Sequence, residues 1–490
     1  MSCEIISLTS IGRLSGSKQA TAKGCHSSQD TIDCDPALWE RIKDHPCYNE
    51  QAHHDFARVH VAVAPTCNIQ CNYCNRKYDC SNESRPGVVS EKLTPEQALR
   101  KVTHIAARLP QLSVVGIAGP GDALANPKWT FQTFELISRA LPHLKLCLST
   151  NGLALPDHLD TIKSFGIDHV TVTINMVDPE IGARIYPWIF FNHRRWTGLD
   201  AAKILHERQM AGLEGLTAAG ILVKVNSVLI PGVNDQHLTE VSAAIRARGA
   251  FLHNVMPLIS DPAHGTAFGL GGQPGPTPTE LTEVQERLSG PGVRLMRHCR
   301  QCRADAVGLL GESRDADFTL DRIPDEQPVL DIAPHQAYRA HIEREWQHRR
   351  EVRAAAERQM AATGPGSSHR LRVAVATSGG GRVNLHFGKA SEFLVYEADT
   401  TGIRLLGPRR VEHYCLGGFG DEARLEAVIA ALTGVDVLLV AKVGDCPRAR
   451  LEQAGLRIDD SHGQDYIEPA IAACFAAARQ ALPSTRRVNA

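Results

Sequence analysis

Three cysteines lie close together in one short segment, where Cys67, Cys71 and Cys74 form a CxxxCxxC motif. Three thiolates on one loop can bind three irons of a 4Fe-4S cluster, whereas electron-transfer clusters usually have four thiolate ligands. The fourth iron would then be open to a small ligand. A structural zinc site generally takes two paired knuckles, and this spacing differs from that pattern. The motif therefore favours a cluster with an open iron over a zinc loop or an ordinary ferredoxin site.

The chain contains more metal-binding side chains than one cluster requires. It has 14 cysteines in 490 residues and no apparent secretion signal, so metal or redox chemistry is a better interpretation than disulfides. Two further clusters would need about eight ligands. The candidate ligands are Cys47, His60, Cys80, Cys147, Cys299 and Cys302. The last two are spaced as a common cluster fragment, whereas Cys147 alone could be a small buried hydrophobe and His60 alone a hydrogen-bonded core histidine.

Short apolar runs alternate with helical segments between residues 58 and 258. This alternation predicts an α/β fold with a parallel sheet, and six units predict a partial (β/α)6 barrel. In such barrels function gathers at the carboxyl ends of the strands. The predicted strands are 58–64, 114–118, 144–149, 169–174, 222–229 and 252–258, and the predicted helices are 95–109, 129–141, 157–165, 200–218 and 236–248.

Strand alternation predicts which of these side chains share a face. Cys147 lies two residues before Ser149, so both should point to the same side of their strand. His60 should share its face with Ala62 and Ala64, whose small side chains leave space for a bulky group.

The motif, its position after the first strand and the βα series resemble the radical SAM (S-adenosylmethionine) family over residues 55–310. The resemblance implies that SAM binds the open iron of the cluster, with Cys67, Cys71 and Cys74 as catalytic ligands, and that Tyr73 packs on the adenine. The implied SAM-binding positions at the strand ends are Gly119, Gly121, Asp122, Ser149, Asn151, Asn175 and Asn226. Asp122 departs from the glutamate usual in that family segment. Each polar strand-end residue alone would more often be a cap or turn former, whereas the set at one barrel rim favours a ligand site.

Segments 45–54, 58–60, 75–80, 117–122, 231–235, 261–266 and 299–308 resemble the nitrogenase cofactor maturases within that family. This resemblance implies that two 4Fe-4S substrate clusters, held by the six candidate ligands, are fused into an 8Fe-9S-C product whose carbide comes from the SAM methyl. Glu83 could cap the open iron before SAM arrives, although a solvated surface glutamate fits equally well.

Residues 371–480 resemble the small cofactor-carrier domain of nitrogenase assembly proteins and predict a small α/β, ribonuclease H-like fold. His386 could touch an anionic cluster there and Lys389 could screen its charge, but a loop histidine capping a turn is the alternative. The sequence thus predicts a flexible leader at 1–35, a barrel at 36–333, a charged helical linker at 334–370 and a small cofactor-binding domain at 371–482.

The bulk composition excludes some classes of partner. A net charge of −1 and the lack of an 18-residue apolar run favour a cytoplasmic protein that binds neither nucleic acid nor membrane. The resemblance implies iron–sulfur donor or scaffold proteins, a reductant such as ferredoxin or flavodoxin, and a downstream cofactor carrier. Two alternatives are a radical SAM enzyme acting on an organic substrate with auxiliary clusters, and a non-catalytic iron–sulfur carrier.

Overall fold

The computed structural model describes residues 35–82, 85–290, 293–299, 301–362, 370–416, 419–420 and 422–481. The predicted leader, apart from its last residue, lies outside these residues, as do Glu83 and the linker segment 363–369. No helix in the described part of the chain is long and apolar enough to cross a membrane.

Six parallel strands form one sheet in the order β1-β3-β4-β5-β8-β9, which confirms the predicted partial (β/α)6 barrel. The two-residue strand β10 (Val307–Gly308) pairs antiparallel with β1 at one edge. The parallel strands are β1 (Ala57–His60), β3 (Leu112–Ile117), β4 (Lys145–Thr150), β5 (His169–Thr173), β8 (Leu222–Leu229) and β9 (Leu252–Pro257). The connecting helices are α2 (Pro95–Arg108), α3 (Pro127–Ala140), α4 (Leu159–Ser164), α6 (Gly198–Ala218) and α7 (Leu238–Ala247).

The two faces of this sheet differ in polarity. One face carries Val115, Leu148 and Val170, which belong to the main apolar core. The other face carries His60, Gly116, Cys147 and His169, which are register partners across β1, β3, β4 and β5. Register partners point to the same side of a sheet, so the polar residues of these strands face the barrel interior.

A helix and a hairpin that the sequence did not predict lie between β5 and α6. They are α5 (Pro179–Ile185), β6 (Trp188–Phe191) and β7 (Arg194–Thr197). The short strand β2 (Ile69–Gln70) pairs with β6, so the hairpin holds the segment that carries the three-cysteine motif. Two further helices, α8 (Ala267–Leu270) and α9 (Pro278–Leu288), follow β9.

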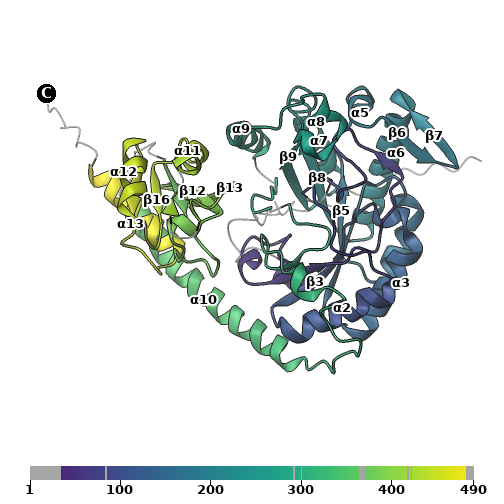
Figure 1. Cartoon of the computed structure of the whole chain (residues 1–490), viewed down its shortest axis with the longest axis horizontal. Helices are drawn as coiled ribbons and strands as arrows, with labels where there is room; N and C mark the ends of the chain where they lie inside the picture. The colour runs from purple at the N-terminus through teal and green to yellow at the C-terminus, as the bar shows by residue number, and fades with distance from the viewer. Residues whose placement is uncertain are drawn as a thin grey trace, which may run out of the picture.

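The predicted charged linker is one long helix, α10 (Ala333–Ala362), which runs from the barrel to the small domain (Figure 1). Trp346 of this helix packs against Phe56, and its Nε1 donates to Asp55 Oδ2 at 2.6 Å. The helix is therefore attached to the barrel just before β1.

The small domain has a five-stranded mixed sheet in the order β13-β12-β11-β16-β17. β12 is antiparallel to its neighbours β11 and β13, whereas β16 and β17 run parallel to β11. This arrangement is the one predicted for a ribonuclease H-like fold. Its elements are β11 (Leu371–Val375), β12 (Glu392–Asp399), β13 (Gly402–Arg410), α11 (Glu422–Ala431), β16 (Val437–Leu439), α12 (Asp445–Gln453), β17 (Arg457–Asp459) and α13 (Ile467–Ala481).

Candidate iron–sulfur site

The three-cysteine loop is held by two polar side chains within it. Gln70 Nε2 donates to the carbonyls of Cys71 at 3.0 Å and Cys74 at 2.8 Å. Arg76 donates to the carbonyls of Cys67 at 3.2 Å and Ile69 at 2.8 Å. Because these bonds fix the backbone, the three thiols are positioned by the fold.

Cys71 is buried, Cys67 and Cys74 are half-buried, and the three thiols lie within electrostatic reach of one another. Burial, with the neighbouring Asp122 carboxylate, raises the pKa of Cys67 to about 12, and burial also raises the pKa values of Cys71 and Cys74. Cys80 lies in the same group, since its raised pKa is due to burial and to all three loop thiols. A thiolate-binding metal cluster would supply the positive charge that such buried thiols need on ionisation.

The described donor set of the loop is made of thiols, which iron–sulfur clusters take as ligands. Zinc requires its ligand atoms within about 2.3 Å of one point. Within the described ranges, no three His, Cys, Asp or Glu side chains are grouped so that they could hold one ion.

The Gly119–Asp122 segment lies directly against the start of the cluster loop. Gly121 N donates to Ala64 O at 2.6 Å, and Asp122 N donates to Thr66 O at 2.8 Å. A Cβ at Gly121 would lie 2.1 Å from Thr66 O, so only glycine allows this approach. This contact brings the predicted SAM-binding segment beside the cluster loop, while its role in binding SAM stays a prediction.

The Asp122 carboxylate connects two loops. Its Oδ2 accepts from Asn151 N at 2.6 Å, and its Oδ1 accepts from the backbone N–H groups of Leu124 and Ala125 at 2.9 and 3.1 Å. Asn151 Nδ2 in turn approaches Cys67 Sγ at 3.6 Å. These contacts hold the strand-end segment of β4 next to the cluster loop.

Tyr73 is fully buried, and its hydroxyl joins a polar network rather than facing an open surface. The hydroxyl donates to Asn82 and accepts from Asn175 Nδ2 at 2.6 Å. Asn175 also donates to Tyr186 at 2.9 Å, and Asn226 donates to Asn82 O at 3.0 Å. The predicted rim residues thus meet in one network, and the stacking of Tyr73 on adenine stays a prediction. Asn82 and Tyr186 were not foreseen.

Cys147 lies on the inner face of β4 with Ser149, as strand alternation predicts, and both are partly exposed to the interior. Asn151 follows at the carboxyl end of the strand. At about 3.3 Å per residue, Cys147 and Ser149 are about 7 Å apart along the strand. A cluster on Cys147 and a cofactor at Ser149 would therefore be neighbours.

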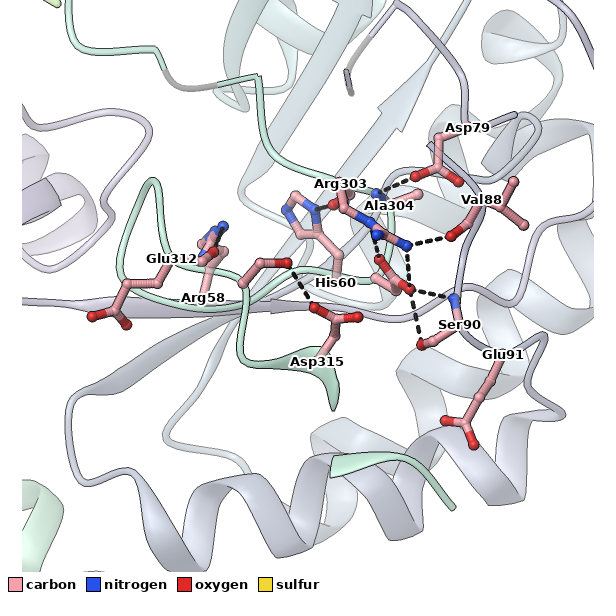
Figure 2. A network of polar contacts seen from close by, with 12 residues as sticks. Arg58, His60, Asp79, Val88, Ser90, Glu91, Arg303, Ala304, Glu312 and Asp315 are labelled. Atoms are coloured by element: carbon pink, nitrogen blue, oxygen red, sulfur yellow. Dashed lines mark hydrogen bonds and ion pairs between the residues drawn. The ribbon is translucent and has the colours of Figure 1, made fainter. Parts of the chain in front are cut away.

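His60 has the hydrogen bonding expected of a metal ligand. Its Nδ1 donates to Arg303 O at 3.0 Å (Figure 2), which leaves the Nε2 lone pair for a metal. Burial lowers the pKa of His60 to about 3, with Arg58 as a further cause, so the ring is neutral at physiological pH. Core packing of a neutral histidine is equally compatible with this bond.

The segment after Cys302 connects three candidate ligands. Arg303 O accepts from His60, and Ala304 N donates to Asp79 Oδ2 at 3.2 Å, next to Cys80 (Figure 2). Arg303 also pairs with Asp305 at 3.1 Å. This network therefore brings together the chain segments of His60, Cys80 and Cys302.

Cys299 lies beside the same interior. Its Sγ accepts from Asn254 Nδ2 at 3.3 Å, and Asn254 also donates to Asn226 Oδ1 at 2.9 Å. Burial raises the pKa of Cys299, and the charge of Lys224 opposes that shift. Asn254 and the buried Lys224, two residues before Asn226 on β8, were not predicted as site residues.

Two predicted residues have other surroundings. Cys47 packs in a cluster with Tyr48 and Leu222, the first residue of β8. In the small domain, His386 Nδ1 accepts from Gly388 N at 3.0 Å, which is the turn-capping contact considered as its alternative role. Metal-binding roles for Cys47 and His386 stay predictions.

The comparisons with known proteins cover both parts of the chain. The radical SAM superfamily model matches residues 61–244, and the dinitrogenase iron-molybdenum cofactor model matches residues 369–477. The chain is 59% identical to FeMo cofactor biosynthesis protein NifB of Sinorhizobium fredii, over 99% of each chain. It belongs to the NifB family.

Other NifB relatives agree with this assignment. Identity is 62% to the Rhodobacter capsulatus protein, over 90% of this chain and 97% of that one, and 52% to the Azotobacter vinelandii protein, over 96% and 94%. Among solved structures, methylornithine synthase matches with a TM-score of 0.35 and 14% identity, over 53% of this chain and 68% of that one. As a radical SAM enzyme of the NifB family, the chain is expected to bind a 4Fe-4S cluster and SAM.

Proposed function

We propose that the chain builds the iron–sulfur precursor of the nitrogenase iron–molybdenum cofactor. Its relatives are named FeMo cofactor biosynthesis proteins. In the proposed reaction, of the lyase or transferase type, two 4Fe-4S substrate clusters are fused into an 8Fe-9S-C product. The SAM-binding cluster and SAM would supply the methyl-derived carbon and the radical chemistry. An iron–sulfur donor, a reductant such as ferredoxin or flavodoxin, and a cofactor carrier are the proposed partners in the cytoplasm.

The main support is the convergence of extra ligands on one barrel interior. His60 and Cys147 are in one register row, Cys80 is close to the loop thiols, and the His60–Arg303 bond lies next to Cys302. An enzyme with a small organic substrate and no auxiliary cluster does not require this set. We therefore assign Cys67, Cys71 and Cys74 to the SAM-binding cluster, and His60, Cys80, Cys147, Cys299 and Cys302 to the substrate clusters. Cys47 packs elsewhere and is added to the second set from the family resemblance alone.

The chain's own groups would then have separate tasks. The Asp122–Asn151 contacts hold the predicted SAM rim beside Cys67. His60, as a neutral ligand, would bind iron less tightly than a thiolate and so permit release of the product. Displacement at the SAM methyl needs reacting atoms about 3–3.5 Å apart, and the short distance along β4 from Cys147 to Ser149 favours such an approach.

Labelled SAM tests this proposal. With SAM carrying a ¹³C, deuterated methyl group, carbon label should enter the acid-extracted cluster and deuterium should enter 5′-deoxyadenosine. The Cys71→Ala variant should form no 5′-deoxyadenosine, and Cys80→Ala should cleave SAM but make no eight-iron product. If SAM is cleaved but no label enters the cluster, the alternative of a radical SAM enzyme acting on an organic substrate is favoured. If SAM is not cleaved at all, the alternative of a non-catalytic iron–sulfur carrier is favoured.

A further inference from the structure

A cavity of about 260 Å³ lies between the barrel and the small domain. The barrel side includes Met256 at the end of β9 and Met296, Arg297 and Cys299 in the segment that follows α9. The small domain contributes residues 406–410 of β13 and the last residue of α11. Neither domain alone encloses this space.

The lining combines positive charge with soft sulfur atoms. Among the described residues that line the cavity, Arg297, Arg409 and Arg410 are cationic and none is acidic. Met256, Met296 and Cys299 contribute two thioethers and a thiol. Thiolate and thioether sulfur are ligands that soft metal centres and iron–sulfur clusters accept, and guanidinium groups attract anions. The cavity therefore fits an anionic metal–sulfur cluster.

Two of the guanidinium groups are fixed by neutral partners. Arg409 donates to the carbonyls of Ala431 at 2.9 Å and Thr433 at 2.7 Å. Arg297 donates to Gln285 Oε1 at 3.1 Å and Ser289 Oγ at 2.8 Å, and its side chain is buried. Burial lowers the pKa values of both groups, with a neighbouring arginine as the second cause in each case. Glu50, Glu286 and Glu397 already offset part of the Arg297 charge, whereas the neighbouring charge of Arg372 opposes that of Arg409. An anion in the cavity would therefore chiefly compensate Arg409.

The cavity also adjoins the barrel interior. Cys299 lines it, and the Cys299 thiol accepts the hydrogen bond from Asn254, which bonds the inner-face residue Asn226. A cluster bound at Cys299 would thus have the barrel interior on one side and β13 on the other.

We propose that this cavity receives the anionic iron–sulfur product as it leaves the barrel, and that Arg409 and Arg410 hold it there by charge. This inference rests on the proposed function. The small domain then contributes to emptying the barrel for the next reaction, and fusion itself does not depend on it. The two events can be measured separately.

The test follows successive reactions of the full chain under anaerobic conditions, with SAM, dithionite, Fe²⁺ and sulfide. An Arg409→Gln/Arg410→Gln double variant should form the same methyl-labelled cluster as wild type in the first turnover. Later turnovers should be slower by at least about tenfold, the loss expected from one of the two charge-assisted contacts that the variant removes, because product remains in the barrel. Iron bound before the first turnover should equal that of wild type.

A second variant and a control make the result decisive. Ala431→Trp should fill the cavity and slow later turnovers without removing a charge. In the control Arg382→Gln, the altered side chain lies over the Tyr466 ring, 3.9 Å from its centroid, and lines no part of the cavity, so all turnovers should be normal. Normal later turnovers in both cavity variants, or a loss of the first turnover in both, would overturn this inference. Absence of labelled cluster in wild type would instead refute the proposed function.

Discussion

A methyl group added at Gly116 tests whether His60 binds iron. In the structure, a Cβ at Gly116 would lie 2.9 Å from His60 Cδ2 and 3.3 Å from Nε2. Carbon atoms in contact are normally about 3.5–4.0 Å apart, so the ring of His60 must move by at least about 0.6 Å. Overpacking of this size typically costs about 1–3 kcal/mol of unfolding free energy. The displaced atoms include Nε2, the nitrogen that would bind the metal.

We expect Gly116→Ala to lower iron content by the amount of one cluster and to abolish the eight-iron product, while SAM cleavage continues. The assays are iron per chain, 5′-deoxyadenosine formation and urea unfolding. Gly290→Ala is the control, because a Cβ there meets no atom of the described residues within 4 Å, and it should match wild type. If Gly116→Ala is destabilised as expected but keeps full iron and makes product, the assignment of His60 as a ligand is wrong.

Three further predictions concern stability and domain roles. Asp122→Asn should place an amide N–H opposite the Asn151 N–H, costing about 1–3 kcal/mol in urea unfolding and reducing SAM cleavage; unchanged stability would contradict the role given to these bonds. Burial raises the pKa of Glu50 from its ordinary value of 4.5 to about 8, so its contribution to stability is complete below pH 4.5 and is lost as pH rises through 8. The free energy of unfolding of wild type in urea should therefore fall between pH 4.5 and 8 by up to about 1.4 kcal/mol per pH unit relative to Glu50→Gln. Parallel pH profiles of the two proteins would refute this. Deleting the chain after residue 363 should leave SAM cleavage and cluster fusion intact, as measured by deoxyadenosine and labelled cluster; a folded, iron-loaded truncation without product would show that the small domain takes part in fusion.

The barrel could be predicted because its strands are short apolar runs separated by amphipathic helices. The run 222–229 coincides with β8, and the other predicted strands differ from the observed ones by a few residues at their ends. The β6–β7 hairpin was missed because its turn contains no glycine. Asn192 and His193 adopt φ values of +49° and +57° there, and an asparagine between aromatic, β-prone residues was the available signal.

The site was predictable where alternation along one strand decides the face, as for Cys147 and Ser149. Contacts between distant segments were not predictable in this way. The bond from His60 to Arg303 joins residues 243 positions apart, and no local pattern encodes it. Polar residues at alternate positions of an otherwise apolar strand, such as Lys224 and Asn226 in β8, were a usable signal for the interior face.

The pairing of β2 with β6 has a consequence for how the protein acquires its first cluster. Ile69 and Gln70 are held by the hairpin strand, and the Gln70 and Arg76 side chains bond the loop carbonyls. These protein–protein contacts therefore supply part of the ordering of this loop during folding, which lowers the entropy cost that remains for iron binding. Cluster insertion into the folded apoprotein should accordingly proceed with little change in backbone circular dichroism, and the loop should resist proteolysis before iron is added.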